Sequence, residues 1–189
     1  MSRDAAPPAE IFELTNGALT AKVASRGAEL VSLRKDGVPY LYEGDAPQFW
    51  PRSAPILFPV VGRCRGDRLV VDGVELKMPR HGFARELEWL PTRGGSDEVE
   101  LELTDADSGR RWPFAYALTA IYQLHPDRLD ARYRLENLER DRDMPFSFGL
   151  HPAFRRPLDP SVPARDWRVT FPRPMRADRR LLEDGLRSG

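Results

Sequence analysis

The stretch Glu98-Val99-Glu100-Leu101-Glu102-Leu103 alternates a carboxylate with an aliphatic side chain at every step. Successive side chains of a β-strand point to opposite faces of a sheet, so this period places one face in a core and the other in water. Residues 129–136 alternate in the same way, whereas residues 116–124 are apolar on both faces and predict a more central strand. These segments predict antiparallel sheets that are solvated on one side.

The connections between these segments are also typical of a β protein. Asn16-Gly17, Asp36-Gly37 and Asp72-Gly73 each separate two strand-like runs, and such dipeptides favour tight hairpin turns. Eighteen prolines interrupt the chain, and no segment has the pattern of an amphipathic helix. We therefore expect an all-β fold, a large antiparallel sandwich forming one domain over residues 1–189, with an irregular charged tail at 172–189.

The charge balance excludes some functions. Basic and acidic residues number 29 each, so the net charge is zero, which argues against nucleic acid or an anionic membrane as partner. One cysteine excludes an internal disulfide framework, and the polar residues 1–10 do not resemble a secretory signal. A cytoplasmic protein is the expectation, and the composition leaves its oligomeric state open.

Two of the three histidines lie in segments that each contain a glycine and an aromatic residue, Arg80-His81-Gly82-Phe83-Ala84-Arg85 and Gly149-Leu150-His151-Pro152-Ala153-Phe154. A strand ending near Met78 and another over residues 86–90 are expected to flank the first. With an unperturbed pKa of roughly 6.5, histidine both donates and accepts protons near neutral pH. The pair could thus serve general acid–base chemistry. The alternative for each is a structural histidine whose ring nitrogens are hydrogen-bonded within the fold. His125 is expected in a turn.

Other chemistries have weaker support. The histidines lack the close spacing of metal ligands, and no second cysteine is present, so we expect neither a metal nor a cofactor. Cys64 lacks the local signature of a nucleophile. The proline-punctuated stretch 43–68 is either a wall of a binding site or a cap on one end of the sandwich.

At these residues the chain resembles the aldose 1-epimerase (galactose mutarotase-like) family, particularly its LacX-like branch. The matching motifs are 26–30 (RGAEL), 50–63 (WPRSAPILFPVVGR), 81–85 (HGFAR), 112–114 (WPF) and 147–154 (SFGLHPAF). The resemblance implies a β-supersandwich with an open cleft for a sugar, an aldohexose. Family members interconvert the α and β anomers of an aldose without cofactor or metal.

Carried onto this sequence, the resemblance implies that His151 is the general acid at the ring oxygen. His81 then binds the sugar and supports that proton transfer, and Arg63 holds sugar hydroxyls. We add Phe83, Phe154 and Trp50 as apolar walls against the sugar, with ordinary core aromatics as the alternative, and Arg85 as a further donor.

The resemblance also has a gap. Family chains usually run considerably further, and their general base is a glutamate in that C-terminal part, which nothing after Phe171 resembles. The fold is therefore expected to be C-terminally incomplete. Three functions remain open: a mutarotase-type enzyme, a non-catalytic sugar-binding derivative, and a truncated product with no function of its own. Within the enzyme class, Arg63, Arg80 and Arg85 could bind phosphate, so a hexose-6-phosphate mutarotase is the alternative.

Overall fold

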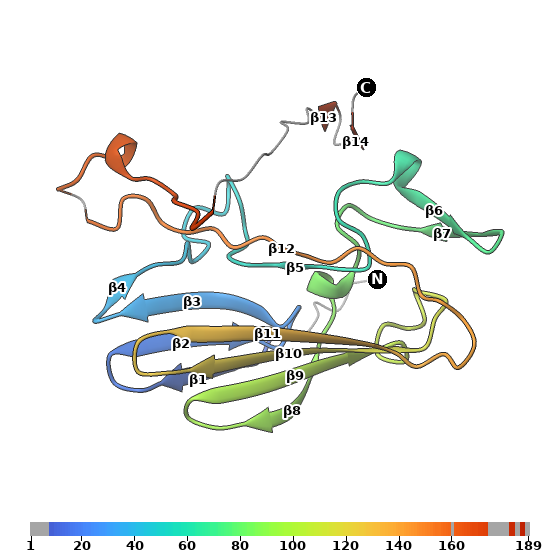
Figure 1. Ribbon diagram of the computed structural model, residues 1–189, viewed down its shortest axis with the longest axis horizontal. Helices are drawn as coiled ribbons and strands as arrows, with labels where there is room; N and C mark the ends of the chain where they lie inside the picture. The colour runs from blue at the N-terminus through green and yellow to red at the C-terminus, as the bar shows by residue number, and fades with distance from the viewer. Residues whose placement is uncertain (1–7, 160, 174–181, 184–185, 188–189) are drawn as a thin grey trace, which may run out of the picture.

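Two four-stranded antiparallel sheets are the largest units of the computed structural model, which describes residues 8–159, 161–173, 182–183 and 186–187. The strand orders are β1-β2-β3-β4 and β11-β10-β9-β8. A two-stranded ladder of β5 and β12 lies alongside these sheets, and the β6–β7 hairpin projects at one end (Figure 1). A further short hairpin joins β13 and β14. Antiparallel pairing throughout these ladders confirms the predicted fold class.

The strands of the first sheet are β1 (Ile11–Thr15), β2 (Leu19–Ala24), β3 (Glu29–Lys35) and β4 (Val38–Pro39). Those of the second sheet are β8 (Leu90–Gly94), β9 (Glu98–Thr104), β10 (Tyr116–Leu124) and β11 (Leu129–Asn137). The smaller ladders contain β5 (Ile56–Leu57), β6 (Arg68–Val71), β7 (Val74–Lys77), β12 (Gly149–Leu150), β13 (Leu182–Glu183) and β14 (Leu186–Arg187). Short 3₁₀ turns are η1 (Arg65–Asp67), η2 (Ala84–Glu86) and η3 (Ala164–Asp166).

The core is formed where the alternation of the sequence predicts it. Val99, Leu101 and Leu103 on β9 are fully buried, while the intervening glutamates stay partly exposed. Strand β10 pairs with β9 on one side and β11 on the other, and its side chains are largely buried, as predicted for a central strand. The Tyr122 hydroxyl donates to the Ala28 carbonyl at 2.7 Å and so ties β10 to the turn before β3.

Strand β11 differs from its prediction. Its alternation is regular, yet the apolar side chains Leu129, Tyr133 and Leu135 are only half-buried. The reason is its place in the sheet: β11 is an edge strand among the described residues, and its inner face borders an apolar cavity of about 300 Å³.

All three predicted hairpin turns are confirmed, and Asn16-Gly17 lies in the connection between the antiparallel strands β1 and β2. Asp36-Gly37 and Asp72-Gly73 are two-residue connections, between β3 and β4 and between β6 and β7, and all four residues have positive φ. Mirror-image turns of this kind match the twist of paired strands, which explains the choice of residues.

The strand expected over residues 86–90 is wrong. The chain forms η2 over 84–86, a single bridge from Arg26 to Glu88, and then β8 from Leu90. Trp89 explains the interruption, because its buried indole N–H donates to the Ala84 carbonyl at 3.0 Å and draws the chain back into a turn.

No helix among the described residues is long and apolar enough to cross a membrane. Within the tail predicted at 172–189, residues 174–181, 184–185 and 188–189 lie outside the described residues.

Candidate functional site

The short strand β5 brings the two histidine segments together. Gly149 and Leu150 of β12 pair with Leu57 and Ile56 of β5, so His151 follows directly and its N–H donates to the Pro55 carbonyl at 3.2 Å. At the other end of β5, Phe58 forms a parallel bridge with Gly82. Residues seventy positions apart in the sequence therefore flank the same short strand.

The two imidazole rings lie next to each other. Their centroids are 6.3 Å apart and the ring planes meet at 44°. His151 is exposed and His81 is half-buried. Trp50 meets His151 edge-on at 5.2 Å, with an angle of 69° between the planes. The structure thus brings together three of the residues that the sequence singled out.

His81 has a defined hydrogen-bonding state. The Gly62 N–H donates to its Nδ1 at 3.0 Å, and the His81 N–H donates to the Gly62 carbonyl at 2.7 Å. Burial lowers the pKa of His81, and the positive charges of Arg85, His151 and Arg80 lower it further. A neutral ring whose Nδ1 accepts a hydrogen bond carries its proton on Nε2. His81 therefore offers one fixed N–H donor.

The backbone before Phe83 approaches β5 very closely. A Cβ on Gly82 would lie 2.0 Å from the Phe58 carbonyl oxygen, and Gly82 has a φ of +73°. Only glycine fits at such a position. The His81-Gly82 dipeptide is thus explained by the packing of its backbone against β5 as well as by its imidazole.

Arg63 lies in the segment that holds His81, one residue after Gly62. Its guanidinium pairs with Asp67 through two hydrogen bonds, Nε to Oδ1 at 2.8 Å and Nη2 to Oδ2 at 3.1 Å. Arg85 lies close enough to His81 to affect its pKa, and its Nη2 donates to the Arg80 carbonyl at 3.0 Å. Each guanidinium therefore has a partner within the chain, and Arg85 is the one of the two whose charge acts on His81.

The aromatic residues proposed as sugar walls have different locations. Phe83 is 1% exposed and packs edge-on against Phe58, so its assignment to a sugar wall is wrong and it belongs to the core. Its N–H bonds to the Phe58 carbonyl, which turns the side chain inward. Phe154 is 68% exposed, and its backbone forms a bridge with Leu41.

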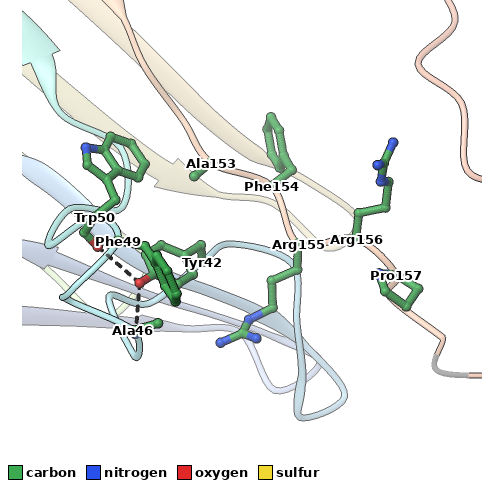
Figure 2. Close-up of a pocket in the computed structure, with 9 residues that line it drawn as sticks. All are labelled: Tyr42, Ala46, Phe49, Trp50, Ala153, Phe154, Arg155, Arg156 and Pro157. Atoms are coloured by element: carbon green, nitrogen blue, oxygen red, sulfur yellow. Dashed lines mark hydrogen bonds between the residues drawn. The ribbon is translucent and has the colours of Figure 1, made fainter. Parts of the chain in front are cut away.

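Trp50 and Phe154 line an adjoining hollow of about 490 Å³ (Figure 2). The Tyr42 hydroxyl holds one wall, because it donates to the Trp50 carbonyl at 3.0 Å and accepts from the Ala46 N–H at 2.8 Å. The Tyr42 and Trp50 rings stack with centroids 6.4 Å apart. Trp50 is therefore held in place against His151.

Sequence reasoning missed two residues beneath this site, Glu29 and Arg52. The Glu29 carboxylate is almost completely buried and accepts hydrogen bonds from the N–H groups of Ser53 and Ala54. Arg52 pairs with Glu29 at 3.2 Å and with Glu86 at 2.6 Å. The available signal was a single carboxylate within the otherwise apolar Gly27-Ala28-Glu29-Leu30 run.

The described residues contain no group of three histidine, cysteine or acidic side chains that could hold a metal ion. Burial raises the pKa of the Cys64 thiol, and the nearby Asp67 raises it further. A raised pKa keeps the sulfur protonated and therefore a weak nucleophile.

Comparison with known proteins gives one family. A family profile described as aldose 1-epimerase matches residues 10–185. The plasmid-encoded protein LacX of Lactococcus lactis subsp. lactis is 31% identical over 167 residues, which cover 85% of this chain and 56% of LacX. This chain therefore spans about half the length of the curated relatives it matches.

Solved structures agree with this result. A galactose mutarotase-like protein from Lactobacillus casei is 33% identical, with a TM-score of 0.72 over 80% of this chain and 52% of that protein. A galactose mutarotase related enzyme from Lactobacillus acidophilus is 26% identical, with a TM-score of 0.75 over 82% of this chain and 52% of that protein. The chain belongs to the aldose 1-epimerase family.

Proposed function

We propose that this chain carries the acid half of an aldose 1-epimerase site, which interconverts the α and β anomers of an aldohexose. The observation that carries the proposal is the imidazole pair. The ring centroid of the exposed His151 lies 6.3 Å from that of the half-buried His81, whose hydrogen bonding and lowered pKa favour the neutral ring. Membership of the family supplies the reaction class.

The proton transfers follow from the state of the two rings. Since the Nε2–H of His81 is assigned to a sugar hydroxyl, His151 is the group that donates the proton to the ring oxygen. A base takes the proton of the anomeric hydroxyl, the bond from C1 to the ring oxygen breaks, and C1 becomes an aldehyde. Rotation about C1–C2 and the reverse transfers close the ring on its other face. Each positioned acid or base typically contributes roughly a hundred- to ten-thousand-fold.

We assign the base to none of the described carboxylates. Glu29 is buried beneath residues 52–54, and the Asp67 carboxylate is held by Arg63. The Nε2–H of His81 binds a sugar hydroxyl, and Arg63 donates to another. Binding by these two residues does not depend on the base.

A neutral sugar suits this site better than a phosphorylated one. Asp67 pairs with Arg63, and Glu86 lies 3.3 Å from the Arg85 guanidinium, so two of the three arginines that could bind phosphate already have a carboxylate partner. A phosphate dianion would need guanidinium groups without such partners.

The test is mutarotation of freshly dissolved α-D-glucose or α-D-galactose, followed by polarimetry. His151→Ala should lower the catalysed rate at least about a hundredfold, while the Kd for the sugar by calorimetry stays within about threefold because other residues hold the ring. His81→Ala and Arg63→Ala should instead weaken binding. The matched control is His125→Ala, which removes the third histidine, an ion-pair partner of Asp130, and should keep the parent rate.

A His151→Ala variant as fast as the parent would disprove the acid assignment. A parent that binds sugar through His81 and Arg63 but does not accelerate mutarotation would favour the non-catalytic sugar-binding derivative. Unchanged Kd values in both binding variants would show that the sugar site lies elsewhere.

A further inference from the structure

The buried carboxylate of Glu29 lies at the start of β3, and its hydrogen bonds all go to the loop of residues 52–54. Its Oε1 accepts from the Ser53 N–H at 2.7 Å and from the Ala54 N–H at 3.0 Å, and its Oε2 accepts from Arg52 Nη1 at 3.2 Å. The Glu29 side chain is 6% exposed. A carboxylate this buried is costly to desolvate unless its oxygens are all hydrogen-bonded, and here each oxygen has a donor.

The loop that Glu29 holds is the partner of the His151 segment. The Ala153 N–H donates to the Ser53 carbonyl at 2.9 Å, and the His151 N–H donates to the Pro55 carbonyl at 3.2 Å. The backbone around His151 is therefore hydrogen-bonded to the carbonyl groups of residues 53–55. In the same segment, the N–H groups of Ser53 and Ala54 donate to the Glu29 carboxylate.

Arg52 extends the connection to the other histidine. Its Nη1 also donates to the Arg85 carbonyl at 3.0 Å, and its Nη2 pairs with Glu86 at 2.6 Å. Arg85 and Glu86 follow His81 by four and five positions, and both lie within η2. The Glu29–Arg52 pair thus joins the backbone beside His151 to the backbone beside His81.

We infer that Glu29 and Arg52 are positioning residues that set the separation and orientation of the two imidazoles. Neither side chain contacts an imidazole, so each acts through the backbone that it holds. This inference rests on the proposed function only in giving the imidazole geometry a catalytic consequence. A displacement of about 1 Å in a catalytic group can cost on the order of a hundredfold in rate.

The first test is Glu29→Gln, which keeps the shape and one carbonyl oxygen for the Ser53 and Ala54 N–H groups but removes the charge facing Arg52. The expected result is a kcat for mutarotation lowered about tenfold, with a smaller rise in KM of about threefold, because His81 also binds the sugar. Arg52→Gln should have a similar effect. The double variant should lose little more than either single variant, since the two residues act as a unit.

The matched control is Glu43→Gln. Glu43 is a half-buried carboxylate that accepts from Ser32 and pairs with Arg34, and no hydrogen bond or ion pair joins it to either histidine segment. Its replacement should reduce thermal stability while leaving kcat at the parent value. A purely structural role for Glu29 would make the two glutamate variants alike.

A second readout does not need activity. Nitrogen-15 NMR of the imidazoles should show displaced His81 and His151 resonances in Glu29→Gln and Arg52→Gln, and unchanged ones in Glu43→Gln. If the parent chain does not accelerate mutarotation, the proposed function fails while the NMR comparison still decides the positioning role. If Glu29→Gln does not fold, Arg52→Gln decides it with the same two readouts. A folded variant with parent kcat and parent imidazole resonances would overturn the inference.

Discussion

At the scale of single residues, His81 and His151 have the same side chain but differ in exposure and in hydrogen bonding. His81 accepts a backbone N–H at Nδ1 and lies beside two arginines, whereas His151 is exposed and meets the edge of Trp50. Burial and neighbouring positive charge both disfavour an imidazolium, so His81 is held neutral. This difference supports the proposed roles, in which His81 binds the sugar and His151 donates the proton.

The lowered pKa of His81 predicts a specific dependence of stability on pH. The unfolded imidazole titrates near 6.5, above the folded value, so the unfolded state binds more protons below that pH. The contribution of His81 is therefore fully present above about pH 6.5 and is lost as pH falls through the lower folded pKa. Chemical unfolding between pH 5 and 8 should show parent stability rising with pH more steeply than that of His81→Gln.

The informative quantity in that experiment is the difference between the two proteins at each pH, because titrating carboxylates contribute equally to both. A constant difference across the range would contradict the neutral assignment of His81.

At the scale of elements, β5 is the shared partner that creates the site. It has two residues, yet β12 pairs with it and Gly82 bridges to the residue that follows it. Glu29 and Arg52 hold the loop immediately before it. The segments on both sides are hydrogen-bonded to β5 or to the residues next to it: His151 donates to Pro55, and Phe83 donates to Phe58. We therefore expect a displacement of this strand to move both rings.

Gly82→Ala tests this arrangement. The new Cβ would lie 2.0 Å from the Phe58 carbonyl oxygen, so the backbone of one segment must move. We expect a loss of more than about 3 kcal/mol in the free energy of unfolding. The sugar Kd should weaken together with stability.

The control is Gly37→Ala in the turn between β3 and β4. Gly37 also has a positive φ, +79°, but no atom lies within 4 Å of an added Cβ, so only about 1 kcal/mol of backbone strain is expected. Thermal and chemical unfolding of both variants measure the difference. Equal losses would show that the close approach to Phe58 contributes nothing beyond the strain of a positive φ.

At the scale of the whole molecule, the described residues leave one large apolar surface open. The nine-residue edge strand β11 presents half-buried side chains to an apolar cavity, and Leu150 and Phe154 on its other side are 47% and 68% exposed. Exposed edge strands and apolar patches are sites of association between chains.

We therefore expect the 189-residue chain to self-associate through this surface. Ala131→Lys places a charge on β11 at the cavity and should shift the protein toward monomer in light scattering coupled to size-exclusion chromatography. Val70→Lys makes a similar apolar-to-lysine change on the exposed β6–β7 hairpin, away from the cavity, and should leave the distribution unchanged. A parent that is monomeric at all concentrations would refute the expectation.

The sequence alone determined the features that depend on neighbouring residues. Alternation over 98–103 predicts β9 and its buried face, and the Asp-Gly dipeptides predict two hairpin turns, because strand period and turn conformation are local properties. Motif resemblance identified the family and the histidine segments. The alternation of β11 was equally clear, but no local signal shows whether another element covers a strand.

Tertiary structure decided what depends on contacts between distant segments. The pairing of β12 and Gly82 with β5 sets the distance between His81 and His151, and the Phe58 carbonyl turns Phe83 into the core. The positioning role inferred for Glu29 depends on its hydrogen bonds from Ser53 and Ala54, which lie more than twenty positions away in the sequence. Such contacts follow from the packing of the whole chain, and no local pattern of residue types encodes them.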